Sequence, residues 1–328
     1  EVYLIGTPAI GNLDNDAGLE IVFSGYSSGN KLFVINPDGS DVDGFPLDLG
    51  EKAKAGPALA DFNGNGLDDI VLGTNDNHIY LIFDDGSTAP GFPFTTDDKF
   101  QAAPSIADIN GEKIIFIGCN DNNLYAINSD GSMRFSLLTS GWVNTSPSFV
   151  DINETLYVLF GSKDDKIYAV DIDGNALSDW PITLDGNIKG GIVISDLDGN
   201  GTPEIVTMTE VGTVSVFHSN GSLYHHFPIA YEQPITGSPI IVDVDDDSDL
   251  EILGGTINAL TALDIKEAGD IASYWNMFRG NNKRTGYFFR GYECGVELGD
   301  VNGDAFVNIL DLVQMSNYIL EISTPTYE

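Results

Sequence analysis

The sequence has few cysteines, few basic residues and no long apolar run. Cys119 and Cys294 are the only cysteines in 328 residues, so at most one internal disulfide can form and a cysteine zinc site is excluded. Fourteen Lys and Arg against 50 Asp and Glu give a net charge of −36, which repels nucleic acid and attracts divalent cations. No apolar run approaches the length of a bilayer-spanning helix, and no charged-then-apolar leader follows Glu1. We expect a processed or excised segment with no nucleic-acid partner and no membrane span.

Signals of an enzyme are also scarce. The chain has four histidines, and it has neither a zinc-ligand spacing nor a nucleophile motif. Its carboxylates recur periodically, so they give no separate support for a paired-carboxylate glycosidase. We expect no catalytic residues and no enzyme activity, with a polysaccharide lyase or glycoside hydrolase as the alternative.

An internal repeat is the strongest feature that the sequence does have. Six similar stretches, among them GPALADFNGNGLDDIVLGT, are anchored at Pro8, Pro57, Pro104, Pro147, Ile192 and Pro239. The anchors lie 43 (147 − 104) to 49 (57 − 8) residues apart, a period typical of propeller blades. Each unit alternates short β-branched runs with Asn, Asp and Gly turns, which predicts four strands.

Two dipeptide signals support this division into strands. Asp-Gly or Asn-Gly pairs predict a tight hairpin in five units, at Asp38, Asp85, Asp130, Asp173 and Asn220. An aromatic-Pro pair such as Phe92-Pro93 indicates an outer edge strand in four units. The prediction is an all-β domain over residues 1–288, a six-bladed β-propeller of four-stranded blades, with a seven-bladed propeller as the alternative.

Four units carry oxygen side chains at matching positions of the loop between the first two strands. These sets are Asn12, Asp14, Asp16 and Glu20; Asp61, Asn63, Asn65 and Asp69; Asp196, Asp198, Asn200 and Glu204; and Asp243, Asp245, Asp247 and Glu251. Alternate residues of a tight loop can point at one centre, and calcium takes about six to eight oxygen ligands. We predict about four Ca²⁺ sites in the propeller. The third and fourth units lack such a loop, and we expect no metal there.

These repeats resemble the FG-GAP repeats of the integrin-α-type β-propeller over about residues 6–288. The resemblance implies calcium loops on one rim and ligand or partner contacts on the opposite face. The same fold serves adhesion modules, lyases and scaffolds, so the resemblance alone names no function.

A basic segment separates the repeats from the tail. Arg279, Lys283, Arg284 and Arg290 lie within residues 275–295, and we assign residues 289–298 to a linker. We expect this segment to neutralise the acidic propeller rim and fix the orientation of the tail. A docking patch for another acidic subunit is the alternative.

The tail, residues 299–328, contains one EF-hand-like loop. Its predicted ligands are Asp300, Asn302, Asp304, the carbonyl of Phe306, Asn308 and Asp311. Their spacing predicts one further Ca²⁺ site, followed by a short helix whose apolar residues need a partner surface.

The segment GDVNGDAFVNILDL resembles one calcium repeat of a dockerin module, over about residues 299–320. Ala305 stands where the family normally has Gly. The module normally pairs two repeats, and only one is visible here. A second repeat beyond this segment and completion on another copy of the chain both stay open.

These observations predict a secreted, extracellular or cell-surface protein that calcium stabilises. Its propeller would bind a protein or a glycan, and its tail would dock it, or assemble it with itself, into an extracellular complex or filament. A polysaccharide-active enzyme, or the substrate-binding module of one, is the alternative.

Overall fold

The computed structural model describes residues 4–16, 18–26, 30–231, 233–256, 258–272 and 274–290. It divides the chain into two units, one of residues 1–108 and 112–289, the other of residues 109–111 and 290–328. The described residues form strands and turns without a helix, which confirms the all-β prediction for them. Within this part of the chain, no helix is long and apolar enough to cross a membrane.

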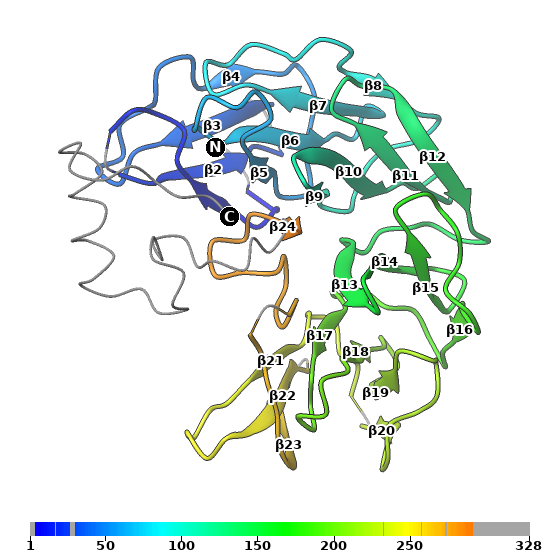
Figure 1. The fold of residues 1–328 in the computed structure, drawn as a ribbon. Helices are drawn as coiled ribbons and strands as arrows, with labels where there is room; N and C mark the ends of the chain where they lie inside the picture. The colour runs from blue at the N-terminus through cyan, green and yellow to red at the C-terminus, as the bar shows by residue number, and fades with distance from the viewer. Residues whose placement is uncertain are drawn as a thin grey trace, which may run out of the picture. The chain divides into compact units, whose positions relative to one another are not determined.

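Six sheets follow one another along the chain (Figure 1). The first sheet contains β1 (Ala9–Gly11), β2 (Glu20–Ser24), β3 (Lys31–Ile35) and β4 (Leu47–Asp48). The second contains β5 (Ala58–Ala60), β6 (Asp69–Gly73), β7 (His78–Ile82) and β8 (Phe94–Thr95). The third contains β9 (Ser105–Ile109), β10 (Glu112–Gly118), β11 (Asn123–Asn128), β12 (Met133–Leu138) and β24 (Tyr287–Arg290).

The remaining three sheets have the same antiparallel order. The fourth contains β13 (Ser148–Ile152), β14 (Thr155–Ser162), β15 (Lys166–Asp171) and β16 (Ile182–Thr183). The fifth contains β17 (Val193–Ser195), β18 (Glu204–Met208), β19 (Thr213–His218) and β20 (Ile229–Ala230). The sixth contains β21 (Ile240–Val242), β22 (Asp249–Gly255) and β23 (Leu260–Ala268). The predicted four strands are therefore present in five sheets, of which the third gains β24 as a fifth strand, and the sixth has three among the described residues.

The turn signals of the sequence mark the turns of the structure. Gly86 and Gly131 follow Asp in tight hairpins and have φ of 82° and 81°, values that a residue with a side chain rarely adopts. The Phe92-Pro93 pair directly precedes the outer strand β8. Pro is tolerated there because an outer strand has no further ladder to donate to.

Apolar clusters hold neighbouring sheets together. Val22 and Ile70 belong to a buried cluster that joins the first and second sheets, and Val71 and Ile115 belong to one that joins the second and third. A further cluster joins the fifth and sixth sheets. Every residue of β6 and of β18 is buried, because each of these strands lies inside its sheet with packed side chains on both faces.

A segment close to the end of the described chain connects the innermost strands. We call residues 274–290 the strap (Figure 1, orange). In five of the six repeats, its main-chain carbonyls accept hydrogen bonds from the main-chain N–H of the residue two positions after the repeat's anchor residue. These bonds run from Ile10 N to Lys283 O (2.8 Å), Leu59 N to Thr285 O (2.9 Å), Ile106 N to Gly286 O (2.7 Å), Ile194 N to Trp275 O (3.0 Å) and Ile241 N to Asn276 O (2.9 Å).

In the fourth repeat, the equivalent residue contacts the strap through its side chain. The ring of Phe149 lies 5.2 Å from that of Trp275 and 5.6 Å from that of Phe288, measured between ring centroids. The strap therefore contacts the same position in all six repeats.

Arg279 fixes the middle of the strap and is only 1% exposed. Its guanidinium donates to the carbonyl oxygens of Gly56 (3.2 Å), Pro57, Arg284 (2.7 Å) and Thr285 (3.3 Å). Burial lowers the pKa of Arg279 to about 9, and the charge of Arg284 acts in the same direction.

This arrangement corrects the expectation that the basic segment neutralises an acidic rim. Arg279 is buried and bonds to main-chain carbonyls, so for this residue the prediction was wrong. Arg284 likewise donates to the carbonyl of Phe278 at 2.6 Å. Lys283 acts partly as expected, since burial raises the pKa of Asp68 and the charge of Lys283 opposes that rise.

We predict that Arg279→Ala lowers the free energy of unfolding by about 3 kcal/mol, because it leaves several buried carbonyls without a donor. Chemical denaturation measures the change. Lys283→Ala, which removes an exposed cation from the same segment, is the control and should change stability by less than about 0.5 kcal/mol. Equal effects of the two substitutions would contradict this role of Arg279.

Candidate metal sites

Four loops between first and second strands share one hydrogen bond that fixes their last carboxylate. In each loop, the main-chain N–H of the second residue donates to a carboxylate oxygen seven residues later. The bonds run from Leu13 to Glu20 (2.7 Å), from Phe62 to Asp69 (2.7 Å), from Leu197 to Glu204 (2.9 Å) and from Val244 to Glu251 (2.7 Å). All four carboxylates are at most 6% exposed. The loops of four separate repeats therefore close in the same way.

A second shared feature is the carboxylate at the first position of three of these loops. Asp61 accepts from the main-chain N–H groups of Gly64 (2.6 Å) and Gly66 (2.8 Å). Asp196 accepts from those of Asn200 and Gly201, and Asp243 from those of Asp246 and Ser248. Each loop thus curls around its own first carboxylate.

Three of the four loops bring together at least three carboxylates. The groups are Asp14, Asp16 and Glu20; Asp196, Asp198 and Glu204; and Asp245, Asp247, Asp249 and Glu251. Within each group the candidate ligand atoms lie within 4.8 Å of one another. Oxygen atoms at this separation suit a hard cation such as Ca²⁺, which binds carboxylate and carbonyl oxygens.

The first loop contains a buried oxygen that lacks a partner. Glu20 is 0% exposed, and its Oε1 has no hydrogen-bond partner among the described residues. Burial raises the pKa of Glu20, and the nearby charges of Asp14 and Asp16 raise it further. A cation would both satisfy Oε1 and offset this repulsion. Asn12, the remaining predicted ligand, donates from its side-chain amide to Gly66 O at 3.5 Å.

In the fifth sheet, Glu204 is also 0% exposed, and its Oε1 lies 3.1 Å from Nδ1 of His218. Burial raises the pKa of Glu204. Asn200 directs its side-chain oxygen to the main-chain N–H of Thr202 (2.8 Å). The main-chain N–H of Asn200 donates to Asp196 (3.1 Å) and Asp198 (3.2 Å), so Asn200 lies beside the group that contains the other three predicted residues.

The second loop has fewer carboxylates, and it includes one that the repeat pattern missed. Asp84 follows the third strand, and its Oδ1 accepts from the side-chain amides of Asn65 (2.8 Å) and Asn63 (3.4 Å). Asp69 is held by the N–H groups of Phe62 and Asp84, yet burial raises its pKa to about 6. Within the described part of the chain, the carboxylate groups of the other loops contain no residue equivalent to Asp84, so the repeat gave no signal for it.

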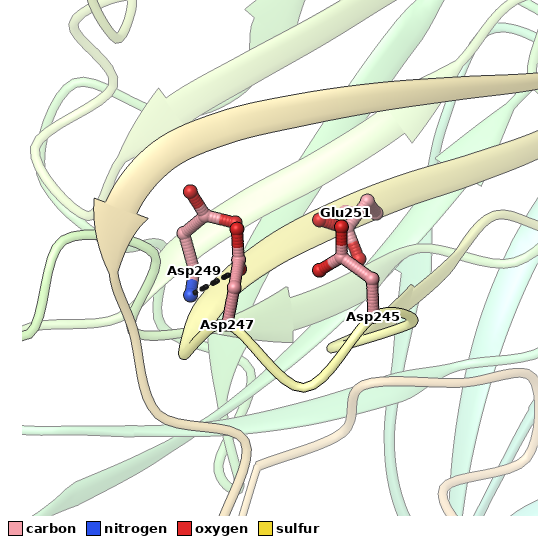
Figure 2. Close-up of side chains that lie close together, drawn as sticks. All are labelled: Asp245, Asp247, Asp249 and Glu251. Atoms are coloured by element: carbon pink, nitrogen blue, oxygen red, sulfur yellow. Dashed lines mark hydrogen bonds between the residues drawn. The ribbon is translucent and has the colours of Figure 1, made fainter.

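The carboxylates that lie together in the sixth loop differ from the predicted set in one residue (Figure 2). Asp249 joins Asp245, Asp247 and Glu251, and its main-chain N–H donates to Asp247 at 3.2 Å. The carboxylate of Asp247 raises the pKa of Asp249 to about 6, with burial adding to the effect. Asp243 is not in this group and instead holds the loop's N–H groups.

The third and fourth repeats have short turns in place of the loop. Asn110 and Gly111 connect β9 to β10, and Asn153 and Glu154 connect β13 to β14, all with positive φ. The direct connection predicted for both repeats is confirmed.

The predicted tail ligands are Asp300, Asn302, Asp304, Phe306, Asn308 and Asp311, and they lie outside the described residues. Comparison by sequence nevertheless characterises this segment. Residues 298–328 match the Dockerin type I domain family. Dockerin domains bind calcium and cohesin partners. The match therefore supports protein interaction through the C-terminal region. No curated protein matches the sequence.

Solved structures resemble the fold at low sequence identity. BBS1N, from its complex with ARL6DN soaked with lead, matches with a TM-score of 0.57 and 10% identity over 81% of each chain. The V. cholerae biofilm matrix protein Bap1 matches with a TM-score of 0.57 and 16% identity, over 79% of this chain and 53% of Bap1. The computationally designed protein Ika8 matches with a TM-score of 0.50 and 15% identity, over 76% of this chain and 69% of that one. These likenesses support a β-propeller-like fold.

We predict that calcium stabilises the protein more as pH rises from about 4 to about 7. The pKa of Asp69 is raised from 3.8 to about 6, so without calcium its contribution to stability is fully present below the unfolded pKa and is lost as pH rises through about 6. Calcium requires the deprotonated carboxylate, so its effect grows over the same interval.

Thermal unfolding of calcium-loaded and metal-stripped protein across this pH range measures the difference. Asp38→Asn, an exposed turn substitution, is the control: hydrogen bonds from Ser40 lower the pKa of Asp38 with or without calcium, so the difference in Tm between the two forms should keep its pH dependence. A difference in Tm that stays constant or shrinks with rising pH would contradict the prediction.

Proposed function

We propose that the chain is a calcium-stabilised binding module that its dockerin segment attaches to a cohesin domain within an extracellular protein complex. The observation that carries this proposal is the match of residues 298–328 to the Dockerin type I family. Dockerin-containing proteins are typically extracellular or associated with the cell surface, where calcium is abundant.

In this proposal, the sheets form an FG-GAP-type propeller of six blades with about four Ca²⁺ sites, and the tail holds one more. Support comes from the four loops with a common closing hydrogen bond and from the unpaired oxygen of Glu20. Calcium that binds only the folded loops adds stability by mass action, about 3 kcal/mol per site when its concentration is about a hundredfold above Kd. The ions also offset part of the charge of −36.

We propose no catalytic role for the propeller. In each of these loops, a main-chain N–H group at the same repeat position holds the buried carboxylate. This arrangement suits the binding of a cation. A polysaccharide-active enzyme remains the alternative, and release of reducing ends or unsaturated sugars from an acidic polysaccharide would favour it.

We predict that the full chain binds a type I cohesin in calcium and that chelation abolishes this binding. Asp304→Ala removes a tail ligand and should weaken cohesin binding by about tenfold or more, as measured by isothermal titration calorimetry. Asp61→Ala is the matched control because it removes a propeller carboxylate, and it should leave cohesin affinity unchanged.

Cohesin binding that survives chelation, or that Asp61→Ala weakens as much as Asp304→Ala, would contradict the proposal. Light scattering of the chain alone provides the second readout. A calcium-dependent oligomer that forms without cohesin would instead favour assembly of the tail with another copy of this chain.

A further inference from the structure

A small cavity lies at the ends of the first strands that are opposite the acidic loops. In the second sheet, for example, Lys54 precedes β5 and the acidic loop follows it. We call this cavity the cup. Its lining includes residues 5–7, 54–56, 101–103 and 189–190, together with Asn144, Ser146 and Phe278.

The repeat explains why a cavity forms there. The two residues before each anchor are small in all six repeats, for example Ala55-Gly56 and Ala102-Ala103. Gly56 comes so close to Thr7 that an added Cβ would lie 2.1 Å from its carbonyl oxygen. Small residues thus let the first strands converge while the space between them stays open. Phe278 of the strap lines the same cavity and is partly buried.

The residue three positions before the anchor provides the chemistry of the cup. These residues are Ile5, Lys54, Gln101, Asn144, Lys189 and Thr236. Five of the six line the cup, and no carboxylate is among its lining residues. The chain has 50 acidic and 14 basic residues, yet this repeated position has two lysines and no acidic residue. The charge at this position is therefore opposite in sign to that of the whole chain.

The two lysines differ in how their charge is used. Lys189 lies 2.9 Å from Glu210, so this carboxylate already offsets part of its charge. Nζ of Lys54 lies 3.5 Å from the neutral side-chain oxygen of Gln101, and no ion pair of Lys54 occurs among the described residues. A carboxylate that entered the cup would therefore find a cation available at Lys54.

Two further groups indicate what accompanies that carboxylate. The side-chain oxygen of Asn144 is buried and has no hydrogen-bond partner in the described part of the chain, so it is an acceptor for a ligand hydroxyl. The ring of Phe278 offers an apolar surface to the face of a sugar ring. A pyranose acid combines a carboxylate, hydroxyl donors and an apolar face in one small ligand.

From these groups we propose that the cup binds one hexuronate unit at the end of an acidic glycan. Lys54 contacts the carboxylate, Asn144 accepts from a hydroxyl and Phe278 packs against the ring. The cup has a volume of about 180 Å³, smaller than the roughly 300 to 1,000 Å³ of a drug-sized site, so a single sugar unit fits it better than a longer segment. This inference deepens the binding role proposed for the propeller and is independent of the tail.

The test uses the full chain in calcium and two forms of one trisaccharide, a tri-uronate and its methyl ester, in which each carboxylate is replaced by an uncharged ester that carries one added methyl group. Calorimetry should show the acid form binding at least about tenfold more tightly. Lys54→Gln should remove most of this difference. Lys52→Gln, which removes an exposed cation two residues away and outside the cup, should leave it unchanged.

Asn144→Asp is a second variant that places a negative charge in the cup, and it should also abolish binding of the acid form. Equal affinity for acid and ester, equal losses from Lys54→Gln and Lys52→Gln, or tighter binding of an oligoglutamate peptide would each overturn the proposal. Cohesin binding is measured on the same variants and should stay intact. Failure of the cup and failure of the dockerin proposal are therefore distinguishable.

Discussion

The hydrogen bonds between the strap and the first strands are the interaction on which the other features depend. In five of the six sheets the first strand lies at one edge of its sheet, and an edge strand exposes main-chain N–H groups that need acceptors. The strap provides a carbonyl acceptor at the same repeat position in five sheets. In the fourth sheet, the ring of Phe149 contacts aromatic rings of the strap instead. Since this acceptor is main chain, the strap's backbone path matters more than its side chains, except at Arg279, Trp275 and Phe288.

Both candidate sites are built on the strands that the strap holds. The acidic loops begin directly after β1, β5, β17 and β21, and the cup residues come shortly before β1, β5, β9, β13 and β17. A change in the position of a first strand would therefore move the loop carboxylates and the lysine side chains together. The two ends differ in charge, with clustered carboxylates at one and Lys54 and Lys189 at the other. In the proposals made above, an acidic ligand and a cation would bind at opposite ends of the first strands.

The repeats made much of the fold and of the loops predictable from sequence. The patterns that allowed this prediction are local: a repeating unit of four strands, hairpin glycines such as Gly86, and the spacing from Asp196 to Glu204. Local hydrogen bonds determine their geometry. The strap was misread because its role depends on contacts more than 200 residues away along the chain, such as that of Arg279 with Gly56. A cluster of basic residues carries no information on whether carbonyls or carboxylates will surround it.

The missed ligands have a similar explanation. Asp84 comes near the second loop from the end of a different strand, and in the sixth loop Asp249, not Asp243, lies with Asp245, Asp247 and Glu251. A fixed spacing identifies which loop residues can reach a centre, and the folded positions of the loop and of neighbouring strands decide which carboxylates meet there.

The central claim is that the repeated acidic loops are calcium sites built on strap-bound strands. Anomalous diffraction from crystals grown in calcium tests it most directly, because it locates each ion independently of its ligands. The account predicts peaks beside Glu20, Asp69, Glu204 and Glu251, and none at the short turns of the third and fourth repeats. Loops without anomalous density in calcium-saturated crystals would contradict it.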